Sequence, residues 1–542
     1  MLRRCTPAPG CGRVLALLLA AGLFARPGSG QTADAGGEAP ALVVMITIDQ
    51  LRGDYFERFG EHLTGGLKRI REGSAFFPNG RQNHALTYTA PGHSTVLSGR
   101  YPASTGILSN DHGVPDPAHP LLGRSTATGA SPRKFRGTTL YDWMRAADPE
   151  AKVVSVSRKD RGAILPVGRA RGQVYWYSQG EFTTSTYYAR ELPDWVKAYN
   201  ARFRPEDWAG REWTLLLPED AYPEPDDMPY EGDGRGTKFP HRITEDLERV
   251  PLWMEGFPWM DSLTLDFALE AMRRERLGER GRPDLLAISL STLDAIGHAF
   301  GPDSREVRDH IYRLDRWLGA FLDSLAARIP PDRMVLALAA DHGVSPFPER
   351  LLMLNQGPAG RIRLGPIVRE LRQSLESRFL VDFEIEQVQG LLLANVHELA
   401  ARGVDVDSLS EAVAARIAEV EGVKRVFTRR SFAAAPADDI EAELWRRHVG
   451  PDVGWLALVV AEPGYMFNAG RSTTHGTTNW LDMNVPIAFM GPGIPAGTHT
   501  RPIDTVDIAP TLAALLGIQP TEPVNGRILP EIAPRAAALD GR

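Results

Sequence analysis

Short runs of mostly apolar residues punctuate the chain. They cover residues 41–49, 152–157, 284–291, 334–341 and 485–491. Runs of this length are typical of strands that are buried on both faces of a parallel sheet. In the interval after the third run, apolar residues recur at helical spacing: Val307, Ile311, Leu314, Leu318, Leu322 and Leu325. Residues 505–517 predict a late helix. This alternation of strands and helices predicts an α/β fold with a doubly wound, mostly parallel sheet.

Two stretches interrupt this rhythm. The first is acidic and rich in Trp, Tyr and Pro, and we expect it to be an irregular, solvated covering loop. The second contains "GLLLANV", "SLSEAVAARIAEVEG" and "VKRVFTR", which predict a strand, a helix and a strand of a small α+β cap. The predicted organisation is three core segments at residues 41–165, 261–346 and 455–535, with insertions at residues 166–260 and 347–454.

The N-terminus has the pattern of a signal peptide. A short basic stretch precedes an apolar run at residues 14–25, which is too short to span a bilayer comfortably, and small residues follow it. We therefore expect residues 1–30 to be removed and the protein to be periplasmic or secreted, the alternative being an uncleaved membrane anchor. No later run is long and apolar enough to predict a membrane span.

The cysteine positions and the net charge limit which metal ligands and binding partners we expect. The two cysteines, Cys5 and Cys11, both lie in the leader, so a disulfide framework and a thiolate metal site are excluded for the mature chain. Any metal must be held by His, Asp and Glu. The formal net charge of −7 argues against a nucleic-acid partner, because such proteins are usually basic.

Polar residues gather where the predicted strands end. They are Asp49, Asp294, His298, Asp341, His342 and His475. Each one alone is an ordinary cap, turn or hydrogen-bonded residue. Together they supply enough carboxylate and imidazole ligands for two zinc ions, which take about four ligands each. Asp294 and His298 stand one helical turn apart in "DAIGH", so both can face one ion.

Thr89 stands at a predicted break between a strand and a helix, in "TYTAPGH". It could simply cap the helix. Alternatively, it is a nucleophile, because a metal ion beside it would lower the pKa of its hydroxyl. Two zinc ions roughly 4 Å apart suit an in-line displacement at phosphorus.

The order Asp49, "TYTAPGH", "GILSND", "DAIGH", "ADHG", "TTHG" resembles the alkaline phosphatase superfamily. It is most similar to the branch shared by nucleotide pyrophosphatase/phosphodiesterases and the phosphate-irrepressible alkaline phosphatases. The resemblance implies an alkaline phosphatase-like core. It implies one zinc held by Asp294, His298 and His475, and a second held by Asp49, Asp341 and His342, with Thr89 as ligand and nucleophile. Asn110, which alone would be read as a turn residue, matches the phosphate-binding asparagine of these enzymes.

A basic segment of the chain bears on whether the substrate is a phosphate monoester or a diester. "SVSRKDRGAILPVG" places Lys159 and Arg161 two residues apart on a segment that we expect to be extended, so both point to one side. The alternative is a solvated, self-paired turn. The segment resembles the Lys-Asp-Arg segment of the phosphate-irrepressible enzymes, in which both cations bind phosphate oxygens. Extra cations favour a monoester, which carries one more charged oxygen than a diester.

The sequence therefore predicts a zinc-dependent alkaline phosphatase that hydrolyses small phosphate monoesters through a phosphothreonine intermediate. The alternatives are a phosphodiesterase or nucleotide pyrophosphatase with the same two-zinc site, and a zinc-binding protein without catalysis. The sequence argues against a sulfatase, because "TAPGH" lacks the Cys/Ser-x-Pro-x-Arg context of those enzymes. No magnesium site is predicted. The remaining histidines that we considered are assigned structural or surface roles: His84, His93, His112, His241, His310 and His397.

Overall fold

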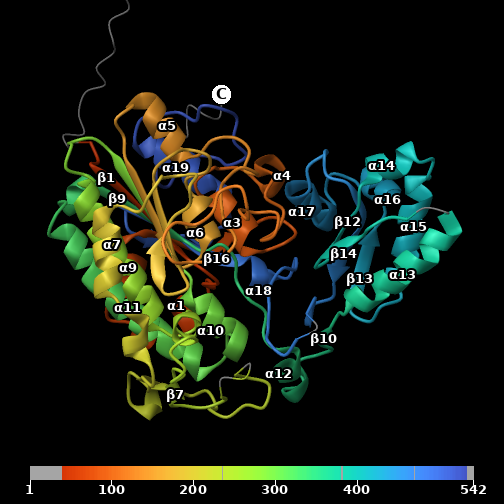
Figure 1. The fold of residues 1–542 in the computed structure, drawn as a ribbon, viewed down its shortest axis with the longest axis horizontal. Coiled ribbons are helices and arrows are strands. Elements are labelled where there is room, and N and C mark those ends of the chain that lie inside the picture. The colour runs from red at the N-terminus through yellow and green to blue at the C-terminus, as the bar shows by residue number, and fades with distance from the viewer. Residues whose placement is uncertain (1–38, 233, 235, 380–381, 469, 534–542) are drawn as a thin grey trace, which may run out of the picture. The chain divides into compact units, whose positions relative to one another are not determined.

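Four parallel strands form the centre of the fold. The computed structural model describes residues 39–232, 234, 236–379, 382–468 and 470–533. Strands β9 (Met334–Ala339), β1 (Leu42–Ile48), β8 (Asp284–Leu290) and β3 (Val153–Ser157) lie side by side in that order, and every residue in them is buried. Leu42 pairs with both Asp284 and Met334, so the strands end level with one another. The predicted doubly wound, mostly parallel sheet is confirmed (Figure 1).

The flanks of this ten-stranded sheet differ from the sequence prediction. β16 (Asn484–Met490) runs antiparallel to β9 and to β2 (Ala75–Arg81). A parallel direction for residues 485–491 was wrong, because an apolar run indicates burial and carries no information on direction. β17 (Gly497–Thr498) and β18 (Ile503–Asp504) pair with β2.

The other edge of the sheet extends into the first insertion. β4 (Gln173–Ser178) pairs with β3, and β5 (Glu181–Thr183) pairs with β4. The expectation of an irregular segment from residue 166 was therefore wrong for these strands, whose short aromatic pattern lacks an aliphatic run. The rest of the insertion is mostly loops, with short elements: α7 (Asp194–Arg202), η2 (Pro205–Trp208), β6 (Glu212–Trp213), η3 (Glu219–Ala221), β7 (His241–Arg242) and α8 (Val250–Met254).

Helices cover both faces of the sheet. On one face α11 (Arg305–Ala326) packs against α2 (Gly66–Gly73) and α9 (Trp259–Glu275). On the other lie α3 (Thr89–Val96), α4 (Pro102–Thr105), α5 (Leu140–Ala147), α6 (Asp160–Ile164) and α19 (Ile508–Leu515). Figure 1 shows the two groups on opposite sides of the strands.

The second insertion has a sheet and a hydrophobic core of its own. Its strands, in spatial order, are β11 (Glu386–Val388), β12 (Leu391–Leu393), β14 (Trp455–Ala461) and β13 (Val423–Phe427). Its helices are α13 (Leu364–Phe379), α14 (Val396–Ala401), α15 (Val406–Ile417), α16 (Arg429–Ala434) and α17 (Ile440–His448). β14 falls in the residues that we expected to begin the third core segment, but it pairs with β12 and β13. An apolar run does not say which of two sheets it joins.

The predicted signal peptide, with Cys5 and Cys11, lies outside the described residues. Within the described part of the chain, no helix combines the length and the hydropathy needed to cross a bilayer.

A buried histidine pair links the last helix of the cap to the core. Nδ1 of His448, the final residue of α17, lies 3.3 Å from Nδ1 of His84, and its Nε2 lies 2.9 Å from the carbonyl oxygen of Leu108. Burial lowers the pKa of His448 to about 3, against the weaker opposing effect of the Leu108 carbonyl. Burial, and then the neighbouring His448, also lowers the pKa of His84. Both imidazoles are therefore neutral in the folded protein at neutral pH.

This pair makes the fold sensitive to acid. Below the ordinary histidine pKa of 6.5, the unfolded chain takes up protons that the folded chain excludes, so the free energy of unfolding falls with pH. His448 alone should account for about 2 kcal/mol between pH 8 and pH 5. Urea unfolding at the two pH values should show a smaller loss in His448→Gln than in the wild type. The control, His397→Gln, removes an exposed histidine of α14 and should match the wild type. Equal losses in all three proteins would contradict this assignment.

Candidate active site

The carboxyl ends of the four central strands gather the predicted site residues. Asp49 follows β1, and Asp341 and His342 follow β9. Asp294 and His298 lie on α10 (Thr292–Phe300), directly after β8. Lys159 follows β3, and His475 comes from the loop between β15 (Tyr465–Met466) and α18 (Trp480–Met483). Parallel strands end at one edge of a sheet, which explains why residues so distant in sequence meet.

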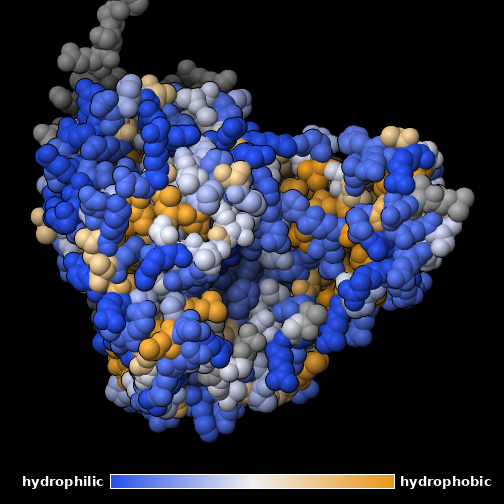
Figure 2. Space-filling model, in the orientation of Figure 1, coloured by the Kyte–Doolittle hydropathy of each residue, from blue (hydrophilic) through white to orange (hydrophobic). Residues whose placement is uncertain are grey.

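The surface is hollowed over this edge. Figure 2 shows a recess with hydrophilic lining in the middle of the face, near the position of α18 in Figure 1. Of the site residues, His298 is partly exposed, with 31% of its side chain accessible to solvent.

The first possible metal group consists of Asp294, His298 and His475, whose donor atoms all lie within 4.8 Å of one another. Nε2 of His298 lies 3.2 Å from Oδ1 of Asp294 and 3.2 Å from Nε2 of His475. Nδ1 of His298 donates to the carbonyl of Thr473, and Nδ1 of His475 donates to the carbonyl of Thr87. In the neutral imidazoles these bonds place the hydrogen on Nδ1, so the lone pair of each Nε2 faces the carboxylate, which is the arrangement of metal-ligating histidines.

The second group is Asp49, His342 and again Asp294. Oδ1 of Asp49 lies 3.3 Å from Nε2 of His342, and Nδ1 of His342 donates to the carbonyl of Gly343. Asp341, which the motif resemblance implies as a ligand here, lies slightly farther away, with Oδ2 3.5 Å from Nε2 of His342. Asp294 therefore stands between the two groups, and Asp341 borders the second one.

The site has more negative than positive side chains, which favours the binding of cations. Three buried carboxylates, Asp49, Asp294 and Asp341, converge with one ammonium group, because Nζ of Lys159 lies 2.6 Å from Oδ2 of Asp49 and 2.6 Å from Oδ2 of Asp294. Burial opposes ionisation of Asp294, but Lys159 and then His298 outweigh it and hold its pKa well below the usual range. Burial, reinforced by Asp294 and Asp341, raises the pKa of Asp49.

Two carboxylate oxygens of this group lack hydrogen-bond donors. Oδ1 of Asp49 and Oδ2 of Asp341 are buried, and neither has a hydrogen-bond partner among the described residues. Buried carboxylate oxygens without donors are costly, whereas a divalent cation would satisfy them. The oxygen and imidazole donors are those that zinc accepts. The site thus fits the predicted metal in charge and in ligand type.

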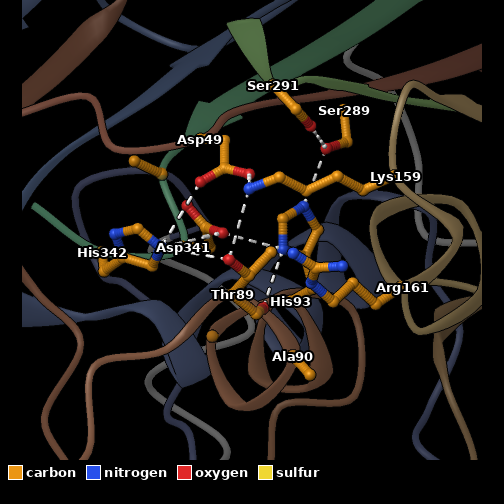
Figure 3. A network of polar contacts seen from close by, with 12 residues as sticks. Asp49, Thr89, Ala90, His93, Lys159, Arg161, Ser289, Ser291, Asp341 and His342 are labelled. Atoms are coloured by element: carbon orange, nitrogen blue, oxygen red, sulfur yellow. Dashed lines mark hydrogen bonds and ion pairs between the residues drawn. The ribbon is translucent and has the colours of Figure 1, made fainter. Parts of the chain in front are cut away.

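Thr89 is the first residue of α3 and is fully buried. Its Oγ1 lies 3.3 Å from Nε2 of His342 and 3.5 Å from Nζ of Lys159 (Figure 3). The helix lies close to the end of β9, because a Cβ atom on Gly92 would lie 2.1 Å from the carbonyl oxygen of Asp341. Glycine at this position therefore lets the Thr89 turn approach the carboxylates.

Asn110 borders the same turn. Its Oδ1 accepts a hydrogen bond from the backbone N–H of Ala90, at 3.0 Å. This contact fixes the orientation of the side-chain amide, and its NH₂ group, which donates to none of the described residues, can donate to a ligand next to Thr89.

Lys159 and Arg161 do not share one side of an extended segment, so that expectation was wrong. Lys159 has extended backbone angles (φ −93°, ψ 138°), but α6 begins at Asp160, and Arg161 lies in its first turn. An acidic residue at that position favours a helix start, which the charge pattern alone concealed. Both side chains nevertheless reach the neighbourhood of Thr89 (Figure 3). Nε of Arg161 is buried and has no hydrogen-bond partner in the described structure.

Two residues of the site were missed in the sequence. The side chain of Gln50 donates to Oδ1 of Asp294 at 2.8 Å, and its backbone N–H donates to Oδ1 of Asp341. His93, assigned only a structural or surface role, lies fully buried beside Thr89 and Asp341. Its spacing of four residues from Thr89, one helical turn, is the signal that could have identified it.

Comparisons with known proteins agree with the motifs. The model of the family "Type I phosphodiesterase / nucleotide pyrophosphatase" matches residues 43–483. Alkaline phosphatase PhoV of Synechococcus elongatus is 31% identical over 514 residues, covering 91% of this chain and 93% of PhoV. A Myroides odoratus protein named calcium-transporting ATPase is also 31% identical, covering 89% of this chain and 92% of its own.

The fold also has a match among crystal structures. Alkaline phosphatase PafA, whose Elizabethkingia meningoseptica sequence is 29% identical over 92% of this chain and 95% of its own, is a close structural match. Its wild-type crystal structure superposes with a TM-score of 0.84 at 28% identity, covering 91% of this chain and 99% of that one.

Proposed function

The chain belongs to the type I phosphodiesterase/nucleotide pyrophosphatase family, and from that premise we propose that it is a zinc-dependent alkaline phosphatase acting on phosphate monoesters. The observation that supports this most strongly is the position of Thr89, whose hydroxyl lies within 3.5 Å of both a predicted metal ligand and a cation. The similarity to PhoV and PafA, both named alkaline phosphatases, supports the same choice.

In this proposal the ligand roles follow the motifs. Asp294, His298 and His475 would hold one zinc ion, and Asp49, Asp341 and His342 the other, with Thr89 beside it. Zinc bound here would lower the pKa of the Thr89 hydroxyl and stabilise the leaving oxygen. Oδ1 of Asp49 and Oδ2 of Asp341 support this assignment, since both are buried, neither has an aligned hydrogen-bond donor among the described residues, and both can still ligate a cation.

The remaining residues bind the phosphoryl group. Thr89 Oγ1 attacks phosphorus, the bond to the leaving alcohol breaks, and water then hydrolyses the phosphothreonine. The NH₂ group of Asn110 and Nε of Arg161 are donors that no described residue engages. The ammonium of Lys159 pairs with Asp49 and Asp294 in this structure and would turn to the phosphate oxygens once cations neutralise those carboxylates. Three donors of this kind favour the dianionic monoester over a diester, although a diesterase would use the same Thr89 and ligands.

The cellular location and the division of the chain belong to the same proposal. The leader sequence favours a periplasmic or secreted enzyme after removal of residues 1–30. The three core segments, with the insertions at residues 166–260 and 347–454, remain a prediction apart from the strand corrections described above.

Metal analysis combined with kinetics tests the proposal. The purified protein without its leader should hold about two zinc ions per chain and should cleave an aryl phosphate monoester faster than the corresponding diester or ATP. His342→Ala should lose zinc and activity together, because removing a ligand opens the site. His397→Ala, which removes an exposed histidine, should change neither. A fully active preparation without metal would overturn the zinc assignment.

A further inference from the structure

His93 joins three elements of the site without being a predicted ligand. It lies one helical turn after Thr89 in α3 and is fully buried. Its Nδ1 lies 2.9 Å from the carbonyl oxygen of Thr89 and 3.0 Å from Oδ2 of Asp341, and its Nε2 lies 2.9 Å from Oγ of Ser289 on β8 (Figure 3). One imidazole ring therefore contacts the nucleophile turn, the end of β9 and the end of β8.

The neighbours of the ring determine which nitrogen carries its hydrogen. Nδ1 faces two acceptors, the Thr89 carbonyl and the Asp341 carboxylate, so Nδ1 must be protonated. The N–H is aligned with the Thr89 carbonyl, while its contact with Asp341 is a short electrostatic one. Oδ2 of Asp341 is thus held in place by His93 and still has lone pairs to offer a cation.

Serine hydroxyls continue this network on the other edge of the ring. Oγ of Ser289 lies 3.3 Å from Oγ of Ser291, which lies 3.4 Å from Oγ of Ser157. Ser157 in turn accepts a hydrogen bond from the backbone N–H of Lys159 at 3.0 Å. All three serines are buried. The polar network therefore runs from the Asp341 carboxylate to the backbone of a phosphate-binding residue.

We propose that His93 is a positioning residue, which fixes the Asp341 carboxylate relative to the Thr89 turn. Through the serine hydroxyls it also fixes the start of the Lys159 segment. The proposal rests on the proposed function, because it requires Asp341 to be a zinc ligand. Packing already fixes the backbone of Asp341, since a Cβ on Gly92 would meet it. His93 supplies what packing cannot, the orientation of the carboxylate itself. Outer partners of metal ligands typically contribute about 10–100-fold to metal affinity or activity.

The test compares graded variants of this ring. His93→Ala removes the contacts of both Nδ1 and Nε2, whereas His93→Asn keeps an amide donor near the position of Nδ1. Ser289→Ala leaves the contacts of Nδ1 intact and removes the first serine. The matched control is Ser94→Ala, which deletes a buried hydroxyl of the same helix whose partners among the described residues are Pro91 and Thr105.

Two readouts separate positioning from folding. Zinc retention during challenge with a chelator, and kcat for an aryl phosphate monoester, should each fall about 10–100-fold in His93→Ala. His93→Asn should recover part of both, Ser289→Ala should lower kcat with little loss of zinc, and Ser94→Ala should change Tm alone. If His93→Ala does not fold, the other variants still test the proposal. We then expect kcat to fall from the wild type to Ser289→Ala and further to His93→Asn, and equal kcat values in the three proteins would contradict the positioning role.

The outcomes also separate this proposal from the function on which it rests. If the wild type binds zinc and His93→Ala retains zinc and kcat at wild-type levels, the positioning role is overturned and the proposed function stands. An equal loss in Ser94→Ala would likewise reduce His93 to a structural residue. If the wild type binds no zinc and lacks phosphatase activity, both proposals fall.

Discussion

Thr89→Ala should lower kcat/KM for an aryl phosphate monoester by at least about 10³-fold, because removal of a covalent nucleophile leaves only binding and electrostatic effects. The variant should retain its zinc, since six other ligands remain in the proposed site. Thr89→Ser restores a hydroxyl at the first position of α3 and should recover much of the lost rate. Kinetics and zinc content measured on the same preparations would show whether Thr89 is the nucleophile or merely a helix-terminal residue.

The stereochemistry of the reaction gives an independent check. Two successive in-line displacements, first by Thr89 and then by water, retain the configuration at phosphorus. Hydrolysis of a chiral phosphate monoester by the wild type should therefore proceed with retention. Inversion would rule out the phosphothreonine intermediate, as would Thr89→Ala with near wild-type activity.

The double substitution Lys159→Ala/Arg161→Ala should change specificity as well as rate. Charge-assisted hydrogen bonds to phosphate are worth about 1.5–3 kcal/mol each, which corresponds to roughly one to two powers of ten in rate for each residue. The loss should be steep for a monoester and much smaller for a diester, which lacks one charged oxygen. The measurement is kcat/KM for both substrates, with zinc content determined in parallel because Lys159 also contacts Asp49 and Asp294.

A cation at the opposite end of the same strand provides the control. Lys152 precedes β3 and its Nζ donates to the carbonyl of Glu275, away from the candidate site. Lys152→Ala should leave the ratio of the two activities unchanged. Equal losses on monoester and diester in the double variant, or a wild type that prefers the diester, would replace the monoesterase proposal with the diesterase one.

The sequence was informative wherever strand ends carry the chemistry. Parallel strands bring their carboxyl ends together, so the pattern of apolar runs alone was enough to group Asp49, Asp341 and the pair on α10. Strand direction was not readable in the same way, and β16 is antiparallel. The reason is physical, because burial selects apolar residues regardless of which way the chain runs.

Side-chain direction was the second limit. The spacing of Lys159 and Arg161 predicts a shared side only on an extended backbone, and the helix start at Asp160 removes that condition. His93 was missed because a lone histidine in a helix resembles many structural histidines. Its contacts with Asp341 and Ser289 come from two other strands, and a single sequence does not reveal them.

The wide spread of the site along the chain bears on how this protein folds. The residues gathered at the sheet edge range from Asp49 to His475, and the parallel pairs β1–β8 and β1–β9 join segments more than 200 residues apart. Such contacts have high contact order, so the entropy of loop closure is lost before they stabilise anything, and folding is correspondingly slow. The complete ligand set exists only after the loop that carries His475 has docked. If the site binds zinc as proposed, the metal would therefore act late, by mass action on the finished fold, and would not be the nucleus around which the chain folds.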